Sequence, residues 1–211
     1  MSTDRRRKQQ RPAASDRAPS RRRMLGEFSA RFFIAAILLL WPWKGLGPAF
    51  VSVIGGLHAP LLNLVVDDPA SVLIAPDARH DSWNALVTVR TEGLSQGLAL
   101  DVRRTPYLPM SILVAFILAV PGLRAERRTV AVALGLVLLQ ALPGLRLVAL
   151  FAEPGPLNVV HLPGLLVGFL GVITRVLVLP PGMAFAIPIL LALLLIAVLD
   201  PRALVRAQFS R

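Results

Sequence analysis

The sequence contains no cysteine among its 211 residues. This absence excludes a disulfide framework, a thiolate metal site and a cysteine nucleophile. The chain also lacks a G-x-S-x-G nucleophile elbow, an H-E-x-x-H zinc motif, a Walker A loop and a dinucleotide-binding loop. We therefore predict a non-catalytic protein that uses no metal or organic cofactor.

Acidic residues are scarce. Twelve Asp and Glu stand against 23 Lys and Arg, which gives a net charge of +11, while 55% of the residues are hydrophobic and the mean hydropathy is +0.65. Such an apolar composition predicts an integral membrane protein. The basic residues lie mostly in tails and loops, where they favour anionic lipid headgroups as partners and give no reason to expect nucleic acid. The apolar segments lack the acidic residues of a proton or cation path.

The amino-terminal part combines a basic tail with a first apolar stretch. Nine of the first 23 residues are Lys or Arg, so we predict a disordered cytoplasmic tail over residues 1–27. Residues 28–66 predict a first transmembrane helix followed by an interfacial helix. Either one helix crosses from residue 32 to about 50 with Lys44 reaching outward, or the helix kinks at Pro42 and continues along the outer surface.

The clearest apolar run lies at residues 106–123 and predicts the second crossing. It carries no charge from Pro106 to Gly122, and arginines crowd the turn at residues 124–128 that follows. Arginines beside a crossing are retained on the cytoplasmic side. This run therefore starts outside and ends inside.

Residues 67–105 differ from their flanks, since six acidic residues outnumber four arginines. Three short runs, at residues 71–75, 85–91 and 97–102, carry strand signals and are separated by turn-like sequences. We predict a small antiparallel β meander outside the membrane, too small to be stable alone.

The rest of the chain predicts a third crossing at 129–152, an interfacial or re-entrant segment at 153–182, a last crossing at 183–200 and a cytoplasmic tail at 201–211. The predicted fold class is membrane α-helical, with about four transmembrane helices and a small antiparallel β insert. Sixteen of the 23 Lys and Arg would then lie inside, with both termini in the cytoplasm. A crossing by the 153–182 segment would make five.

A cluster of two carboxylates and a histidine at residues 77–81 could ligate a cation or exchange protons. Its spacing matches no metal motif, however, and Asp is an ordinary turn residue. We regard this cluster and other aromatic and basic residues as candidate contacts with a partner or with headgroups. The candidates are Asp77, His80, Asp81, Trp83, Arg103, Arg104, Tyr107, Arg146, His161 and Arg175.

Two motifs carry a family resemblance. Arg103, Tyr107 and Pro109 form an R-x-x-x-Y-x-x-P sequence that leads into the second crossing, and residues 179–188 form L-P-P-x-x-x-x-x-x-P. With the basic tail, the outer β segment and the arginine-rich turn, they resemble small membrane proteins associated with exosortase systems in Gram-negative bacteria. The resemblance implies an inner-membrane accessory protein beside a transpeptidase-like enzyme that processes C-terminal sorting signals. No catalytic residue of that enzyme carries over.

Two functions of different classes remain open. The first is an accessory or scaffold protein whose β insert and interfacial segment bind a membrane partner, such as an exosortase-like enzyme. The alternative is a small membrane enzyme or transporter that acts on anionic lipid or envelope precursors through Arg146, Arg175, His161 and the 77–81 cluster. We favour the first, because an active site needs convergent titratable groups and the sequence does not bring these residues together.

Overall fold

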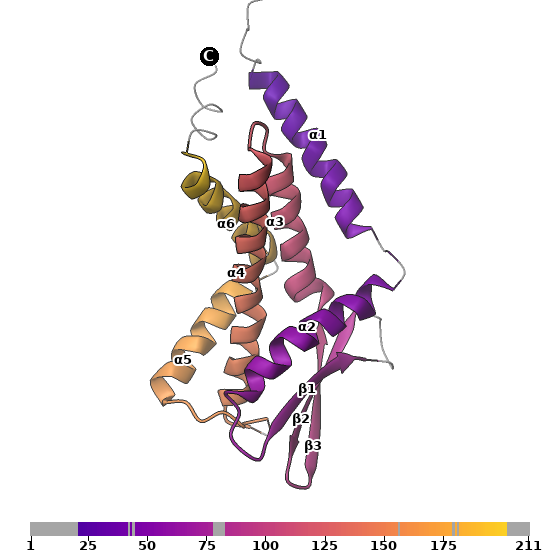
Figure 1. Cartoon of the computed structure of the whole chain (residues 1–211). Coiled ribbons are helices and arrows are strands. Elements are labelled where there is room, and N and C mark those ends of the chain that lie inside the picture. The colour runs from indigo at the N-terminus through magenta and orange to yellow at the C-terminus, as the bar shows by residue number, and fades with distance from the viewer. Residues whose placement is uncertain are drawn as a thin grey trace, which may run out of the picture.

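The computed structural model describes residues 21–41, 43, 45–77, 83–155, 157–178, 180 and 182–201. Within these residues the chain forms six α-helices, two π-helical turns and three strands (Figure 1). Their order is α1 (Arg21–Leu40), α2 (Leu46–Asn63), β1 (Ser71–Pro76), β2 (Asn84–Thr91), β3 (Leu94–Asp101), η1 (Arg103–Tyr107), α3 (Leu108–Ala119), α4 (Ala125–Ala152), α5 (Gly164–Ile173), η2 (Thr174–Val178) and α6 (Met183–Leu199).

The first apolar stretch forms two separate helices. Helix α1 ends at Leu40, and Gly45 takes φ of 79°, a left-handed conformation that glycine adopts at little cost. The indole Nε1 of Trp43 donates to the carbonyl oxygen of Leu38 at 2.9 Å and satisfies one of the free carbonyls at the end of α1. A single helix from residue 32 to about 50 is therefore excluded, because α1 ends at Leu40 and a second helix, α2, begins at Leu46. The predicted course along the outer surface stays a prediction.

The predicted three-stranded antiparallel meander is present, in the order β1-β2-β3. The first two strands match the predicted ranges closely. The third begins three residues earlier than predicted, because Glu92 and Gly93 alone form the turn and Thr91 pairs with Leu94. Gly93, the second residue of this turn, has φ of 79°, a left-handed conformation that glycine adopts at little cost.

One face of the sheet packs against α2 and the carboxyl end of α4 to form the first hydrophobic core. The main contributors are Val51, Ile54 and Leu62 of α2, Val72, Ile74 and Val87 of the sheet, and Leu147 and Phe151 of α4. Alternation along β2 places Ala85, Val87 and Val89 inward. The extended stretch before α5 adds to this core: the N–H groups of Val159 and Val160 donate to the carbonyl oxygen of Phe151 at 3.0 and 3.2 Å.

Helix α2 lies unusually close to the edge strand β1. A Cβ atom added at Gly55 would lie 2.5 Å from the carbonyl oxygen of Ile74. Eight residues further along, Oδ1 of Asn63 accepts the N–H of Val72 at 2.6 Å, and Nδ2 of Asn63 donates to the Val72 carbonyl at 3.1 Å. The Asn63 side chain thus pairs with backbone groups of an edge strand that would otherwise need another partner.

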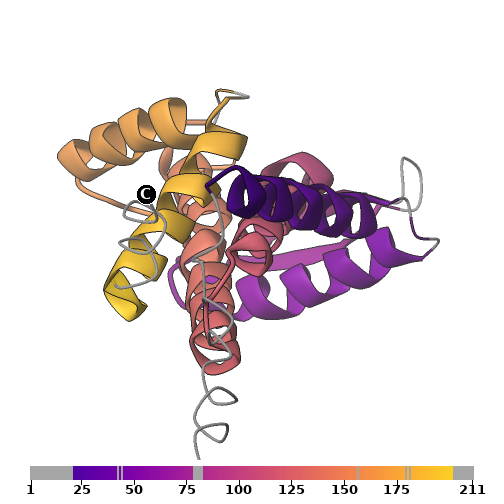
Figure 2. The same cartoon turned by 90° about the horizontal axis from the view of Figure 1, so that it is seen from above.

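A second core joins α3, α4 and α6 around Leu113, Ile117, Leu139 and Ile196. Seen from above, α4 runs between α1 and α2 on one side and α5 and α6 on the other (Figure 2). Helix α1 packs against α3 through aromatic side chains. The ring centroids of Phe28 and Phe32 lie 5.3 and 6.4 Å from the ring centroid of Phe116. This second core is separate from the core under the sheet.

The start of α4 is tied to the end of α6. Nη1 of Arg127 lies 2.9 Å from Oδ2 of Asp200, whose side chain is 7% exposed. Arg128 donates through Nη2 to the carbonyl oxygen of Val120 at 3.0 Å and so closes the turn between α3 and α4. Figure 1 shows the starts of α1 and α4 and the end of α6 at one end of the molecule, and the sheet at the other.

The prediction of about four transmembrane helices is wrong. Among the described residues only α2 and α4 are long and apolar enough to cross a membrane, and each is 33% buried. The predicted crossing at 106–123 is not a single α-helix, because Pro106 belongs to η1 and Val120 leaves the helix with ψ of 116°. The 12 residues of α3 span only about 18 Å at 1.5 Å per residue.

The predicted third crossing at 129–152 coincides with α4, whereas the first and the last predicted crossings fail for different reasons. Helix α1 begins with a run of arginines and also carries Glu27 and Arg31, while α6 has 17 residues. Helix α2 is the segment predicted to lie at the interface, and it packs on the sheet. Two long apolar helices do not by themselves define a membrane protein, because a core helix of a soluble protein meets the same criteria.

The close approach of α2 to β1 predicts how substitutions at two neighbouring glycines of α2 change the stability of the protein. Gly55→Ala would place a methyl group against the Ile74 carbonyl, and we expect a loss of about 1–3 kcal/mol from overpacking. The matched control is Gly56→Ala, whose Cβ would meet nothing within 4 Å and should stabilise α2 by up to about 1 kcal/mol. Thermal unfolding of the two purified full-length variants measures the difference. Equal unfolding temperatures would contradict the close approach.

Candidate functional site

The segment from the end of β3 through η1 into α3 carries three predicted contact residues: Arg103, Arg104 and Tyr107. It joins the sheet to the helices, because Val102 donates its N–H to the Trp83 carbonyl at 3.1 Å and Tyr107 donates its N–H to the Val102 carbonyl at 3.1 Å. The side chains of this segment face two different places: an aromatic cluster and a cavity.

The aromatic cluster consists of Phe50, Trp83 and Tyr107. The centroids of Trp83 and Tyr107 are 4.5 Å apart, and those of Phe50 and Tyr107 are 5.1 Å apart in an edge-to-face arrangement. The guanidinium carbon of Arg103 lies 5.9 Å from the Trp83 ring centroid, within the range of a cation–π contact. Trp83 is only 9% exposed, so its ring packs within the chain.

The hydroxyl of Tyr107 donates a hydrogen bond to the carbonyl oxygen of Leu39. Leu39 lies in the last turn of α1, where carbonyl groups have no partner inside the helix. The aromatic cluster therefore fixes the end of α1 against α2, the sheet and η1.

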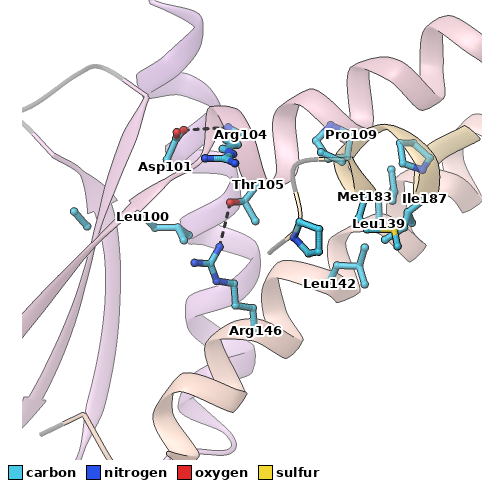
Figure 3. Close-up of a pocket in the computed structure, with 14 residues that line it drawn as sticks. Leu100, Asp101, Arg104, Thr105, Pro109, Leu139, Leu142, Arg146, Met183 and Ile187 are labelled. Atoms are coloured by element: carbon cyan, nitrogen blue, oxygen red, sulfur yellow. Dashed lines mark hydrogen bonds between the residues drawn. The ribbon is translucent and has the colours of Figure 1, made fainter. Parts of the chain in front are cut away.

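The cavity lies between the end of β3, η1, α4 and α6 and has a volume of about 320 Å³ (Figure 3). Arg104 and Arg146, two of the predicted contact residues, both line it although they are far apart in the sequence. Nη1 of Arg146 lies 3.4 Å from Oγ1 of Thr105, a long hydrogen bond. The main-chain N–H of Arg104, rather than its guanidinium, donates to Oδ1 of Asp101 at 3.0 Å.

The predicted cluster at residues 77–81 is described only at Asp77; His80 and Asp81 lie outside the described residues. Asp77 follows β1, is 8% exposed and donates its main-chain N–H to the carbonyl oxygen of Asn84 at 2.9 Å. It lines neither the cavity nor the aromatic cluster.

His161 and Arg175 lie away from the cavity. Nδ1 of His161 contacts Oδ2 of Asp67 at 2.5 Å, with both side chains substantially exposed. This pair accompanies a hydrogen bond from the Asp67 N–H to the Val159 carbonyl at 2.9 Å and so joins the loop after α2 to the stretch before α5. Arg175 lies exposed on η2.

Sequence reasoning missed a buried polar chain that links three helices. His58 of α2 is 4% exposed, and its Nε2 donates to Oε1 of Gln140 on α4 at 2.9 Å. Nε2 of Gln140 in turn lies 3.0 Å from Sδ of Met110 on α3. Gly144 leaves room for the imidazole, since a Cβ there would lie 3.3 Å from Nδ1 of His58. The only signal in the sequence was a polar Gln within an apolar helix.

The part of the chain that the structure describes contains no group of three or more His, Asp or Glu side chains that could hold a metal ion. Comparison of the chain with protein-family models, with curated proteins and with solved structures finds no match in any of the three. The resemblance to exosortase-associated proteins therefore stays a prediction.

The Tyr107 hydroxyl can be tested apart from its ring. Tyr107→Phe keeps the aromatic contacts and removes the hydrogen bond to Leu39, so we expect a loss of about 0.5–1.5 kcal/mol in stability. Amide hydrogen exchange should rise selectively at the carboxyl end of α1. Tyr107→Leu, which also removes the ring contacts, should cost more. Unchanged exchange at the end of α1 in both variants would contradict this anchoring role.

Proposed function

We propose that this protein is a non-catalytic accessory protein of the bacterial inner membrane. The observation that carries the proposal is the apolar exterior of its helices. Large hydrophobic side chains are exposed along α1, α4, α5 and α6, among them Phe33, Ile37, Val137, Leu165, Phe169, Leu190 and Val198. Removing each such side chain from water is worth about 1.5–3 kcal/mol. A surface this apolar favours a lipid environment.

The arrangement of charge supports an orientation. The exposed arginines Arg22, Arg23 and Arg124 belong to the starts of α1 and α4, which lie at the end of the molecule opposite the sheet (Figure 1). Basic residues that flank membrane segments are retained in the cytoplasm. We therefore place this end on the cytoplasmic side and the sheet on the other side, without assigning a number of crossings.

The second face of the sheet supplies a contact surface. The face opposite α2 carries Leu73, which is 48% exposed, and Leu86, which is 37% exposed; Ala99 stands next to Leu86 in the pairing register and is exposed as well. Polar residues on the same face, such as Arg90, border this apolar strip. A small apolar strip with a polar rim suits a protein contact, and the family resemblance supplies an exosortase-like enzyme as the candidate partner.

The absence of cysteine makes the orientation directly testable. Ser95→Cys on the sheet and Glu126→Cys at the start of α4 each introduce one exposed thiol into a chain that has none. In spheroplasts, a membrane-impermeant maleimide should label Ser95→Cys at once and Glu126→Cys only after permeabilisation. The chain should also stay in the membrane pellet after an alkaline wash. The reverse labelling pattern would refute the orientation, and release by the wash would refute the membrane location.

The partner contact is tested by site-specific photocrosslinking. A photoreactive residue at Leu86 should form an adduct with a co-expressed exosortase-like enzyme, because Leu86 lies on the uncovered face of the sheet. The control position is Val137, which is 69% exposed on α4 and should give lipid adducts alone. If Leu86 recovers only lipid, or if both positions recover the enzyme equally, the proposed docking face is wrong.

A further inference from the structure

The cavity between the sheet and the helices is divided into a cationic side and an apolar side. Asp101, Arg104 and Thr105 lie on the side of the sheet, and Leu139, Met183 and Ile187 lie on the side of α4 and α6 (Figure 3). Arg146 extends from α4 toward Thr105 and completes the polar side. A ligand with one charged end and one apolar end matches this division.

Arg146 is the residue of this cavity whose position is energetically unfavourable without a ligand. It extends from a long apolar helix and is only partly exposed, yet its single hydrogen bond in the described chain is the long contact to Thr105. A guanidinium carries five N–H donors, so most of those on Arg146 have no protein acceptor among the described residues. An arginine placed in this way is expected to serve a bound anion.

Arg104 adds a second positive charge to the same cavity. Within the described residues, neither Arg104 nor Arg146 forms an ion pair within 4 Å. Asp101 also lines the cavity and reduces its charge to a net +1, but its carboxylate accepts the main-chain N–H of Arg104. Two guanidinium groups that face one cavity repel each other, and an anion between them relieves that repulsion.

From this geometry we infer that the cavity binds an amphiphile that carries a phosphate ester and a net negative charge. The phosphate oxygens would take the donors of Arg104 and Arg146, since the planar fork of arginine matches phosphate geometry. The apolar chain would lie against Leu139, Met183 and Ile187. A volume of about 320 Å³ lies at the low end for small-molecule sites, so the cavity takes the headgroup and the first part of the chain only.

The inference does not depend on the accessory function or on the exosortase-like partner. It concerns a site lined by the end of β3, η1, α4 and α6, whereas the proposed docking face is centred on Leu73 and Leu86; of the docking-face residues named above, only Ala99 also lines the cavity. Failure of the crosslinking experiment would leave this binding site untouched, and the reverse also holds.

Binding is tested with the purified full-length chain in neutral detergent micelles. The probes are dioleoyl phosphatidylglycerol, dioleoyl phosphatidylcholine, oleate and inorganic phosphate. Saturating phosphatidylglycerol should raise the unfolding temperature by about 5–10 °C, as expected for a ligand at roughly a hundred times its dissociation constant. Native mass spectrometry supplies the affinity. The other three probes should shift the unfolding temperature far less.

Four variants separate the site from general lipid effects. Arg104→Gln and Arg146→Gln should each weaken phosphatidylglycerol binding by about tenfold or more, the worth of a charged hydrogen bond. Ala184→Leu, which adds apolar volume to the cavity lining, should weaken it as well. Arg175→Gln removes an exposed arginine outside the cavity and should leave binding unchanged.

Each alternative result overturns a stated part of the inference. An equal shift with phosphatidylcholine, or equal weakening by Arg175→Gln, means a general lipid effect. An equal rise in unfolding temperature with inorganic phosphate means that the cavity binds a free anion. An equal rise with oleate means that the ligand does not need a phosphate group. Normal binding by Ala184→Leu refutes the apolar half. If Arg146→Gln fails to fold, Arg104→Gln and Ala184→Leu decide the question, because Arg104 is exposed and Ala184 lies beside open volume.

Discussion

The contact between α2 and β1 is the constraint on which the position of the sheet depends. A sheet with one apolar face needs another layer of structure to cover that face. Helix α2 supplies that layer, and the missing side chain at Gly55 lets it approach the backbone of Ile74. Asn63 then hydrogen-bonds both backbone groups of Val72, so the helix cannot slide along the strand without breaking that pair. The sheet is thereby held in one position relative to α2.

That position determines where the junction residues lie. Strand β3 runs through Val102 directly into η1, so a fixed sheet also fixes the start of α3. Along this stretch Arg103 and Tyr107 face the aromatic cluster, while Arg104 and Thr105 face the cavity. One short segment thus serves two purposes: it anchors the end of α1, and it places a cation opposite Arg146.

Much of the local structure follows from the sequence, because it depends on neighbouring residues. Alternating apolar residues predicted β1 and β2 closely, and apolar runs located α4 and α6 within a few residues. The number of crossings did not follow. Hydropathy measures an apolar run but does not show where the helix ends. In the run at 106–123 the helix ends after Ala119, and the part of it that is α-helical is the 12 residues of α3, which follow η1 directly. An apolar run also does not distinguish a lipid-facing helix from one that packs on a sheet, as α2 does.

The long-range pairs of the site could not be predicted from the sequence for a different reason. His58 and Gln140 are 82 residues apart, and His161 and Asp67 are 94 apart, so no local pattern relates them. The segregation of Arg104 and Arg146 from His161, Arg175 and Asp77 likewise appears only when the chain is folded. Sequence reasoning named both cavity arginines as contacts but could not show that they share one lining.

Helix α4 contacts α2 and lines the cavity close to Pro143 and Gly144, two residues that are unfavourable inside a helix. Pro143 lacks the N–H that would bond the Leu139 carbonyl, yet α4 continues through it to Ala152. A Cβ atom at the adjacent Gly144 would lie only 3.3 Å from Nδ1 of His58, so glycine at this position gives the imidazole room. His58 of α2 can therefore pack closely against the middle of α4. Arg146 follows two residues later and reaches Thr105 across the cavity. A regular alanine–leucine helix would be more stable alone, but a side chain at position 144 would force His58, and with it the hydrogen bond to Gln140, to shift by a few tenths of an ångström.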